Sequence, residues 1–268
     1  MPEEIRVLFG AGRMGAALAA GWLAEPGHAV PALVDPKPSD QVQAWADAGR
    51  VHLNPPAQPA TTLVIAVKPQ VFGNVASEIG AWIGPKTRVI SIMAGLRLAQ
   101  LSQRLGTDRV VRAMPNTPGA IGQGVVGLSP GDGVSQADLA AARRVLEPLG
   151  LVEGPMSEAN LAVLTAVSGS GPAYVFLLAE AMAIAGKAEG LPDDVAERIA
   201  RATVVGAGAL LAQSEEAPLA LRQAVTSPGG VTEAALDVLI DEGGLPSLMR
   251  KAVKAGIARD RALSGGGG

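Results

Sequence analysis

The sequence predicts an α/β fold in which a doubly wound parallel sheet is followed by an all-α domain. Three observations support this prediction. A glycine-rich turn follows the first apolar run, strand-like and helix-like patterns alternate as far as residue 153, and only helix-like patterns follow residue 157. Alternating strands and helices are typical of a parallel sheet that carries helices on both faces. We therefore expect one domain over residues 1–155 and a helical domain over residues 156–268.

The first apolar run, Ile5–Phe9, leads into a G-x-G-x-x-G turn and then an alanine-rich helical stretch. In this context Gly10 allows the tight turn, Gly12 lets a pyrophosphate approach the backbone, and Gly15 lets the helix lie close on the strand. We expect a Rossmann-type dinucleotide site here; a glycine-rich turn without a ligand is the alternative. The residues expected at the cofactor are Gly10, Ala11, Gly12, Arg13, Met14 and Gly15.

An acidic residue at the end of the second expected strand, Ala29–Val34, bears on which dinucleotide binds. Asp35 lies 20 positions after Gly15 (35 − 15), where a carboxylate can hydrogen-bond the adenosine ribose and so favour NAD. Arg13 and Lys37 are expected to lie close by and can instead hold the 2′-phosphate of NADP, with Asp35 turned away. A turn-forming role before the next proline, without a ligand, is the third interpretation.

The rest of the first domain continues the alternation. Strands are expected at Thr62–Val67, Arg88–Ile92, Arg109–Met114, Val125–Leu128 and Gly150–Glu153, and helices at Gly12–Ala24, Ser39–Gly49 and Gln136–Leu146. Because ligands bind beyond the carboxyl ends of strands in open sheets, the residues that follow these strands are candidate cofactor contacts. They are Val67, Lys68, Pro69, Ala94, Gly95 and Asn116. Pro69 also suits the first position of a helix, and the Asn116 amide can face a ligand or serve only an Asx-type turn.

Beyond residue 155 we find no convincing strand. Helices are expected at Ser157–Val167, Gly171–Gly190, Asp193–Gln213, Ala217–Ala224, Val231–Glu242 and Leu245–Leu263. The chain is 48% hydrophobic but only 3% aromatic, and a helical domain of this kind buries its excess apolar surface against a second copy. We expect a homodimer or a larger assembly.

Two glycine-rich loops open helices in this second domain. Ser168–Tyr174 places Ser170 where a helix N-cap is expected. In Thr226–Thr232, the backbone N–H groups of Ser227, Gly229 and Gly230 can bind a small anion at the helix start, and Thr232 adds a hydroxyl. The loop contains no Arg or Lys, so backbone amides are expected to hold a carboxylate without a charged clamp. The alternative for the first loop is a purely structural turn, and the alternative for the second is an ordinary capped helix with a flexible entry.

Composition excludes several classes of function. A net charge of −3 argues against nucleic acid, and a chain without cysteine and with two histidines has no thiolate or histidine-rich metal centre. The start of the chain is acidic rather than basic, which argues against a signal peptide. We take Ala202–Ala212 as the longest uncharged apolar stretch of the second half, and it is too short to span a bilayer. A soluble cytoplasmic protein without a membrane partner is expected.

The motifs together resemble a known family. They occur in the order found in pyrroline-5-carboxylate reductases, and the resemblance runs from about Ile5 to the last helix. The matching stretches are Gly10–Gly15, Ala66–Pro69, Ala94-Gly95, Met114–Pro118, Ser168–Tyr174 and Thr226–Thr232. The resemblance implies the last step of proline biosynthesis, in which NAD(P)H reduces the cyclic imine 1-pyrroline-5-carboxylate to L-proline.

The resemblance also assigns roles to residues. It implies that Lys68-Pro69, Ala94-Gly95 and Asn116 line the cofactor site, that the Ser227–Thr232 loop holds the substrate, and that the helical domain forms an interlocked dimer. NADPH is the cofactor that the family generally accepts, often with NADH as well. Three positions depart from the family pattern. Arg13 stands where the family often has Asn, and Val231 fills a position often held by Thr or another small residue. Asp35 stands near where the family commonly has a small polar residue or Asn before a basic residue.

A protonated imine suits a site without histidine, because a cationic C=N bond takes a hydride without a separate proton donor. Thr232 is expected to act as the catalytic residue by hydrogen-bonding the ring nitrogen. Glu158 either balances the iminium charge or lies on the surface at its helix N-terminus. The rival interpretations are a β-hydroxyacid dehydrogenase and a non-catalytic NAD(P)-binding sensor. The first places a catalytic lysine on the helix after a glycine-rich turn, whereas here Lys187 comes only near that helix's far end.

Overall fold

The computed structural model describes residues 4–25, 27 and 29–265. The chain divides into two compact units, one formed by Met1–Gly169 with Ile257–Gly268 and the other by Ser170–Gly256. The first unit contains the sheet and the second contains only helices. The division at residue 155, where strands give way to helices, stays a prediction.

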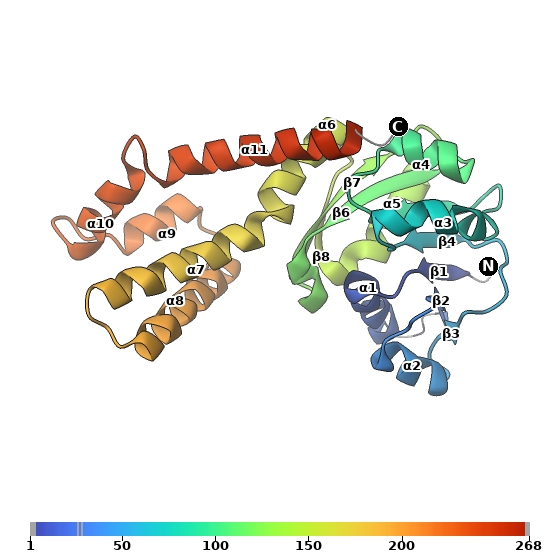
Figure 1. The fold of residues 1–268 in the computed structure, drawn as a ribbon, viewed down its shortest axis with the longest axis horizontal. Helices are drawn as coiled ribbons and strands as arrows, with labels where there is room; N and C mark the ends of the chain where they lie inside the picture. Colours follow the sequence, from blue (N-terminus) through green and yellow to red (C-terminus); the bar gives the residue numbers. More distant parts are fainter. Residues whose placement is uncertain (1–3, 26, 28, 266–268) are drawn as a thin grey trace. The chain divides into compact units, whose positions relative to one another are not determined.

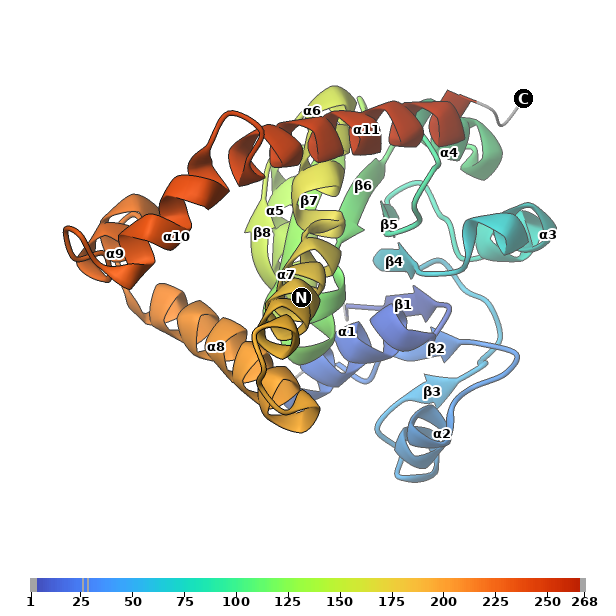
Figure 2. The same cartoon turned by 60° about the vertical axis from the view of Figure 1, so that its left-hand side comes forward.

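The first unit is built on one eight-stranded sheet (Figures 1 and 2). Its strands are β1 (Arg6–Phe9), β2 (Ala32–Val34), β3 (His52–Leu53), β4 (Thr62–Ile65), β5 (Arg88–Ser91), β6 (Val110–Pro115), β7 (Gly124–Pro130) and β8 (Gly150–Glu153). The spatial order is β3-β2-β1-β4-β5-β6-β7-β8. The order reverses at β1, which is the switch point of a doubly wound sheet.

Two strands, β7 and β8, run opposite to the other six strands of the sheet. β7 pairs antiparallel to β6, with Met114 opposite Gly127, whereas all other neighbouring strands run parallel. The cause is the connection, because only residues 116–123 separate the two strands and a parallel crossover needs a dozen residues or more. A short 3₁₀ turn, Thr117–Ile121, makes this link. The predicted doubly wound parallel sheet is confirmed for β1 to β6, whereas β7 and β8 depart from the parallel direction.

Helices cover both faces of the sheet. They are α1 (Arg13–Ala24), α2 (Asp40–Asp47), α3 (Pro69–Gly80), α4 (Leu98–Leu105), α5 (Gln136–Leu146) and α6 (Glu158–Leu164). One core cluster joins α1, α2 and α5 to strand residues such as Leu8, and the other joins α3 and α4 to their strand neighbours such as Val7. Successive strand residues point to opposite faces, so both faces are apolar. The short strand β3 and the helix α4 are additions to the sequence-based prediction.

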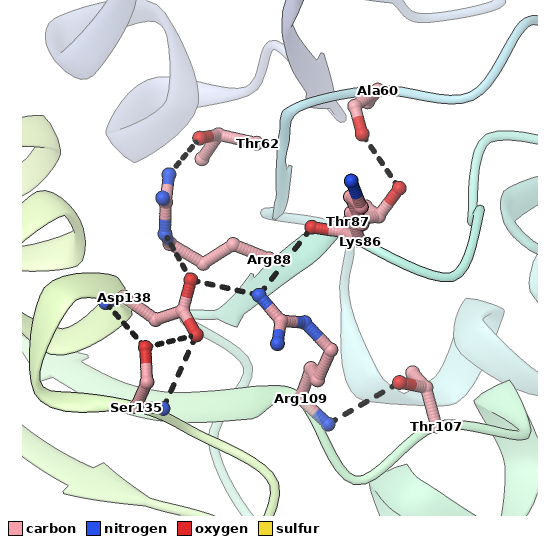
Figure 3. Close-up of polar contacts among 9 residues, drawn as sticks. All are labelled: Ala60, Thr62, Lys86, Thr87, Arg88, Thr107, Arg109, Ser135 and Asp138. Atoms are coloured by element: carbon pink, nitrogen blue, oxygen red, sulfur yellow. Dashed lines mark hydrogen bonds and ion pairs between the residues drawn. The ribbon is translucent and has the colours of Figure 1, made fainter.

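A buried acid ties together the amino ends of several strands (Figure 3). Asp138, at the start of α5, lies 2.8 Å from Arg109 and 3.5 Å from Arg88, and it accepts hydrogen bonds from the Ser135 hydroxyl and N–H. Burial by itself raises the pKa of Asp138, but the Ser135 hydrogen bonds and the two arginine charges outweigh it, so the pKa lies below its usual range. This cluster therefore lies at the amino ends of the parallel strands, opposite the side of the sheet where their carboxyl ends lie.

The second unit has almost no buried interior of its own. It contains α7 (Gly171–Ala188), α8 (Asp193–Gln213), α9 (Pro218–Ala224), α10 (Val231–Ile240) and the first part of α11 (Leu245–Gly265). Throughout Ser170–Gly256, which the structure describes in full, only Ala183, Ala196 and Ala200 are buried. Large apolar side chains stay exposed on all five of these helices; they include Phe176, Leu177, Ile184, Ile199, Val205, Leu210, Leu219, Val238 and Leu248.

The assignment of Ala202–Ala212 as the longest uncharged apolar stretch of the second half was wrong. No charged residue lies between Glu158 and Glu180. The helical run Glu158–Ala188 is 31 residues long and has a window of mean hydropathy 1.7 that is only 17% buried. It is the single helical run among the described residues that is long and apolar enough to cross a membrane. A run so little covered by its own chain needs another apolar surface against it.

Candidate functional site

The glycine-rich turn has the form that a dinucleotide pyrophosphate requires. Gly10 has a φ of +95°, and a Cβ there would lie 2.9 Å from the Ala66 carbonyl carbon. A Cβ on Gly15 would lie 2.2 Å from the Gly10 carbonyl oxygen, whereas a Cβ on Gly12 would meet nothing within 4 Å. Two glycines therefore allow the tight packing of turn and helix, and the third leaves open space at the helix start.

Within the described part of the chain, the start of α1 offers unpaired donors to an anion. Gly12 is its N-cap residue without a side-chain hydrogen bond, and the first turn contains no acid. The first N–H groups of a helix have no intrahelical partner and carry the positive end of its dipole. The turn and α1 thus fit the pyrophosphate of a dinucleotide.

Asp35 is fixed against this turn by hydrogen bonds to both carboxylate oxygens. Oδ2 accepts from the Ala11 N–H at 2.8 Å and Oδ1 accepts from the Lys37 N–H at 2.8 Å. Asn54 holds the backbone, since its Oδ1 accepts from the Asp35 N–H and its Nδ2 donates to the Asp35 carbonyl, both at 2.9 Å. The expected turn-forming role of Asp35 is therefore present, and it leaves the carboxylate beside the glycine turn. Sequence reasoning missed Asn54, which has a φ of +49°.

A cleft of about 750 Å³ lies along the carboxyl ends of β1, β2 and β4. Of the residues predicted to bind the cofactor, Gly10, Gly12, Asp35, Val67 and Lys68 line it. Sequence reasoning missed several other lining residues, which come from loops and helix faces; they include Pro36, Asn54, Pro55, Val71 and Trp82. The size and apolar walls are those of a small-molecule site.

The other predicted cofactor residues lie outside this lining. Ala11 gives its N–H to Asp35, Met14 packs on the core and Arg13 is exposed at the first position of α1. Pro69 begins α3, which confirms its expected place in a helix. Ala94 and Gly95 follow β5 in a turn in which Ala94 is exposed and Gly95 is half-buried with a φ of +74°.

The Asn116 amide is engaged within the chain. Its Nδ2 donates to the Ser168 carbonyl at 3.0 Å and to the Ser168 hydroxyl at 3.1 Å, and its Oδ1 accepts from the Val125 N–H at 2.8 Å. Ser168 lies in a π-helical turn, Thr165–Gly169, which follows α6. With both amide groups engaged in this way, Asn116 fixes the link between β6 and β7.

The loop before α10 has the expected helix start but fewer free amides than expected. The Gly230 N–H donates to the Ser227 carbonyl at 2.9 Å, and the Gly229 N–H donates to Glu233 Oε2 at 2.7 Å. The amides left without a described partner in this stretch include those of Ser227, Val231 and Thr232, and the Thr232 hydroxyl is likewise unpaired and exposed among the described residues. Sequence reasoning missed Glu233, although an acid at the third position of a helix is a recognised N-terminal signal.

Ser170 is the N-cap residue of α7, as expected, but its side chain makes no capping hydrogen bond. Lys187, in the last turn of α7, donates to Glu197 at 2.7 Å and lies 3.7 Å from Asp193. The hydrogen bond to Glu197 is the main reason why the pKa of Lys187 lies above its usual range. A lysine held protonated in this way is a poor general base.

Glu158 has a structural role that neither sequence-based interpretation described. Its Oε1 lies 3.3 Å from Nη1 of Arg112, whose side chain is 2% exposed, and it accepts from the Leu98 N–H at the start of α4 at 2.9 Å. It does lie in the first turn of its helix, as expected. Glu158 therefore neutralises a buried cation and caps a neighbouring helix.

Comparisons with known proteins agree with this geometry. Residues 158–263 match the family model of pyrroline-5-carboxylate reductase dimerisation, and residues 4–95 match that of the coenzyme F420-dependent NADP oxidoreductases. The pyrroline-5-carboxylate reductase of Synechocystis is 34% identical over 96% of this chain and 97% of its own length. The solved structure of the Coxiella burnetii enzyme covers 98% of this chain and 99% of its own, with a TM-score of 0.88 and 32% identity.

A third relative carries a ligand. The structure of Plasmodium falciparum pyrroline carboxylate reductase with NADP bound covers 98% of this chain and 99% of its own, with a TM-score of 0.77 and 25% identity. Similarity of this extent spans both the sheet-containing unit and the helices. With a full-length relative above 30% identity and the dimerisation model on its helical half, the chain belongs to the pyrroline-5-carboxylate reductase family.

Proposed function

We propose that this chain reduces 1-pyrroline-5-carboxylate to L-proline with NAD(P)H, the last step of proline biosynthesis. The observation that carries the proposal is the full-length similarity to a pyrroline-5-carboxylate reductase, 96% of this chain against 97% of the relative. The open space over Gly12 and the uncapped start of α1 support it, because they fit the dinucleotide that such a reaction needs.

When bound, the reduced nicotinamide supplies the hydride that the C=N bond accepts. The chain's own part is to bind and orient the two reactants. We assign the substrate carboxylate to the free amides of Ser227, Val231 and Thr232, and the ring nitrogen to the Thr232 hydroxyl. Val231 then contributes through its backbone, since its side chain is 90% exposed. A substrate that arrives as an iminium needs no proton donor, so positioning and fixed dipoles supply most of the acceleration.

The rival activities are less well supported. A β-hydroxyacid dehydrogenase needs a lysine near the start of α7, whereas Lys187 lies in its last turn and pairs with Glu197 and Asp193. A non-catalytic sensor has no use for a hydroxyl and unpaired amides in the second unit.

We also propose that the chain works as a soluble cytoplasmic homodimer, with a larger assembly of dimers as the next step. The exposed apolar residues of the second unit fall within the stretch that matches the dimerisation model, residues 158–263. The same stretch contains the apolar run Glu158–Ala188, so a second copy, rather than a bilayer or a nucleic acid, accounts for its exposed surface.

The test is an assay of several substrates, in which the absorbance of the reduced cofactor reports its oxidation or formation. Oxidation of NADH or NADPH that depends on 1-pyrroline-5-carboxylate is the expected result, with proline as the product. Oxidation of 3-hydroxy acids with NAD(P)⁺, without imine reduction, would refute the proposal. Dinucleotide binding without any turnover would favour the sensor.

Thr232→Ala tests the assignment of the substrate loop. We expect kcat/KM for the imine to fall by an amount that corresponds to a loss of about 1–3 kcal/mol in transition-state stabilisation, while the Kd of the cofactor changes little. Thr203→Ala is the matched control, because it removes a threonine hydroxyl from α8, outside the loop. An unchanged kcat/KM in the Thr232 variant would remove this residue from the site.

A further inference from the structure

We infer that this chain selects NADH over NADPH, and that Asp35 sets the selection. The inference rests on the proposed function in one respect, since it takes the 750 Å³ cleft as the dinucleotide site. It departs from the NADPH preference expected from the family resemblance. It also decides between the two orientations of Asp35 that the sequence leaves open.

The first step is that Asp35 cannot turn away at low cost. Both carboxylate oxygens accept backbone N–H groups, from Ala11 and from Lys37, and Asn54 clamps the Asp35 backbone on both sides. Rotating the side chain would leave the N–H of buried Ala11 without its acceptor. Asp35 also lines the cleft. The carboxylate is therefore a fixed part of the site and not a surface group that adapts to its ligand.

The second step concerns what this carboxylate can recognise. Each ionised oxygen has about two acceptor positions, and the backbone uses one on each. One acceptor position per oxygen therefore remains, and a ribose diol, with two adjacent O–H donors, matches this pair. A 2′-phosphate brings negative charge and acceptor oxygens to the same place. The 2′-phosphate and the Asp35 carboxylate are both negatively charged and share no proton, so they repel each other.

The third step weighs the nearby cations. The side chains of Arg13 and Lys37 are exposed, and neither forms an ion pair with Asp35 or with any other described residue. Attraction between exposed charges is screened by salt and costs side-chain freedom. Lys37 lines the cleft, as Asp35 does, whereas Arg13 does not. These cations moderate the repulsion from Asp35, but they do not replace a carboxylate that the backbone holds in position.

The experiment measures the Kd of NADH and of NADPH directly, by calorimetric titration of the full-length protein, beside the kcat/KM for each. We expect NADH to bind at least about tenfold more tightly than NADPH. Asp35→Ser and Asp35→Asn should each reduce the ratio of the two dissociation constants at least about tenfold. The asparagine variant keeps the size and one acceptor oxygen, so it preserves part of the contact with the turn. Asp40→Asn, on the exposed first turn of α2, is the control for loss of a nearby charge and should leave the ratio unchanged.

Equal or tighter binding of NADPH by the unmodified protein would overturn the inference, and so would an unchanged ratio in a folded Asp35→Asn variant. Neither result touches the proposed function, because imine reduction with NADPH would remain. If neither dinucleotide binds, the cleft is not the cofactor site and the proposed function fails with it.

Discussion

Replacing Glu158 by alanine tests the link between a buried cation and the stability of the sheet-containing unit. Arg112 is 2% exposed, its Nε and Nη2 have no partner among the described residues, and Glu158 is the acid that neutralises it. Removing one member of a buried ion pair destabilises a protein by about 3–5 kcal/mol, because the remaining charge stays buried without compensation. Glu158 is 31% exposed, which places the loss near the lower end of that range.

We therefore expect Glu158→Ala to lower the free energy of unfolding by about 3 kcal/mol, which for a chain of this size is a drop in Tm of about 6–12 °C. The assay is urea and thermal denaturation at one fixed protein concentration. Glu153→Ala, which removes an exposed glutamate from β8, is the matched control and should stay within about 0.5 kcal/mol of the parent.

The double variant Arg112→Met with Glu158→Ala separates a charge effect from a packing effect. Since the methionine removes the buried charge, the double variant should be more stable than Glu158→Ala alone. A loss below about 1 kcal/mol in the single variant, or no recovery in the double variant, would refute the reasoning. The rate of NAD(P)H oxidation per folded molecule should be unchanged, because Glu158 neutralises Arg112 rather than the substrate.

Three further outcomes are expected. Gly15→Ala should weaken dinucleotide binding and destabilise the fold by about 1–3 kcal/mol, since its Cβ would lie 2.2 Å from the Gly10 carbonyl oxygen; titration and melting measure both, and wild-type values in both would contradict the packing argument. Asp138→Asn should have a lower free energy of unfolding than the parent at neutral pH, and this difference should close as pH falls through about 4 and below. The reason is that a carboxyl group whose pKa is lowered by folding stabilises the folded state only while it is ionised; a difference independent of pH in urea titrations would exclude the Asp138 charge as its cause. Glu233→Gln should lower KM for the imine with little change in kcat, since Glu233 holds the Gly229 N–H and places a negative charge beside the proposed carboxylate site; a raised KM would show that the acid supports the loop instead.

Much of the fold follows from local sequence pattern. The glycine spacing of residues 10–15, the proline that begins α3 and the strand β8 all depend on short-range backbone preferences, which a sequence displays directly. The direction of β7 does not, because it depends on the length of one connection rather than on the strand's own residues. The two-residue strand β3 is too short to produce a periodic signal.

The candidate site was predictable in part for the same reason. The turn residues and Asp35 carry a recognised spacing, whereas the partners that fix them come from distant positions. Asn54 lies 19 residues from Asp35, and Ser168 lies 52 residues from Asn116. A single sequence gives no sign of such pairings. Glu233 is different, since its place at the start of α10 was visible and its reach back to Gly229 is a local contact.

The scarcity of buried side chains in Ser170–Gly256 links folding to association. Three alanines bury far less apolar area than the ordering of five helices requires, so most of the missing stabilisation must come from a second chain. Mass action then makes the melting temperature of these helices rise with protein concentration. On dilution to nanomolar protein we expect the dimer to dissociate and these helices to unfold before the sheet does. Each protomer then loses its helical half and keeps its nucleotide-binding half.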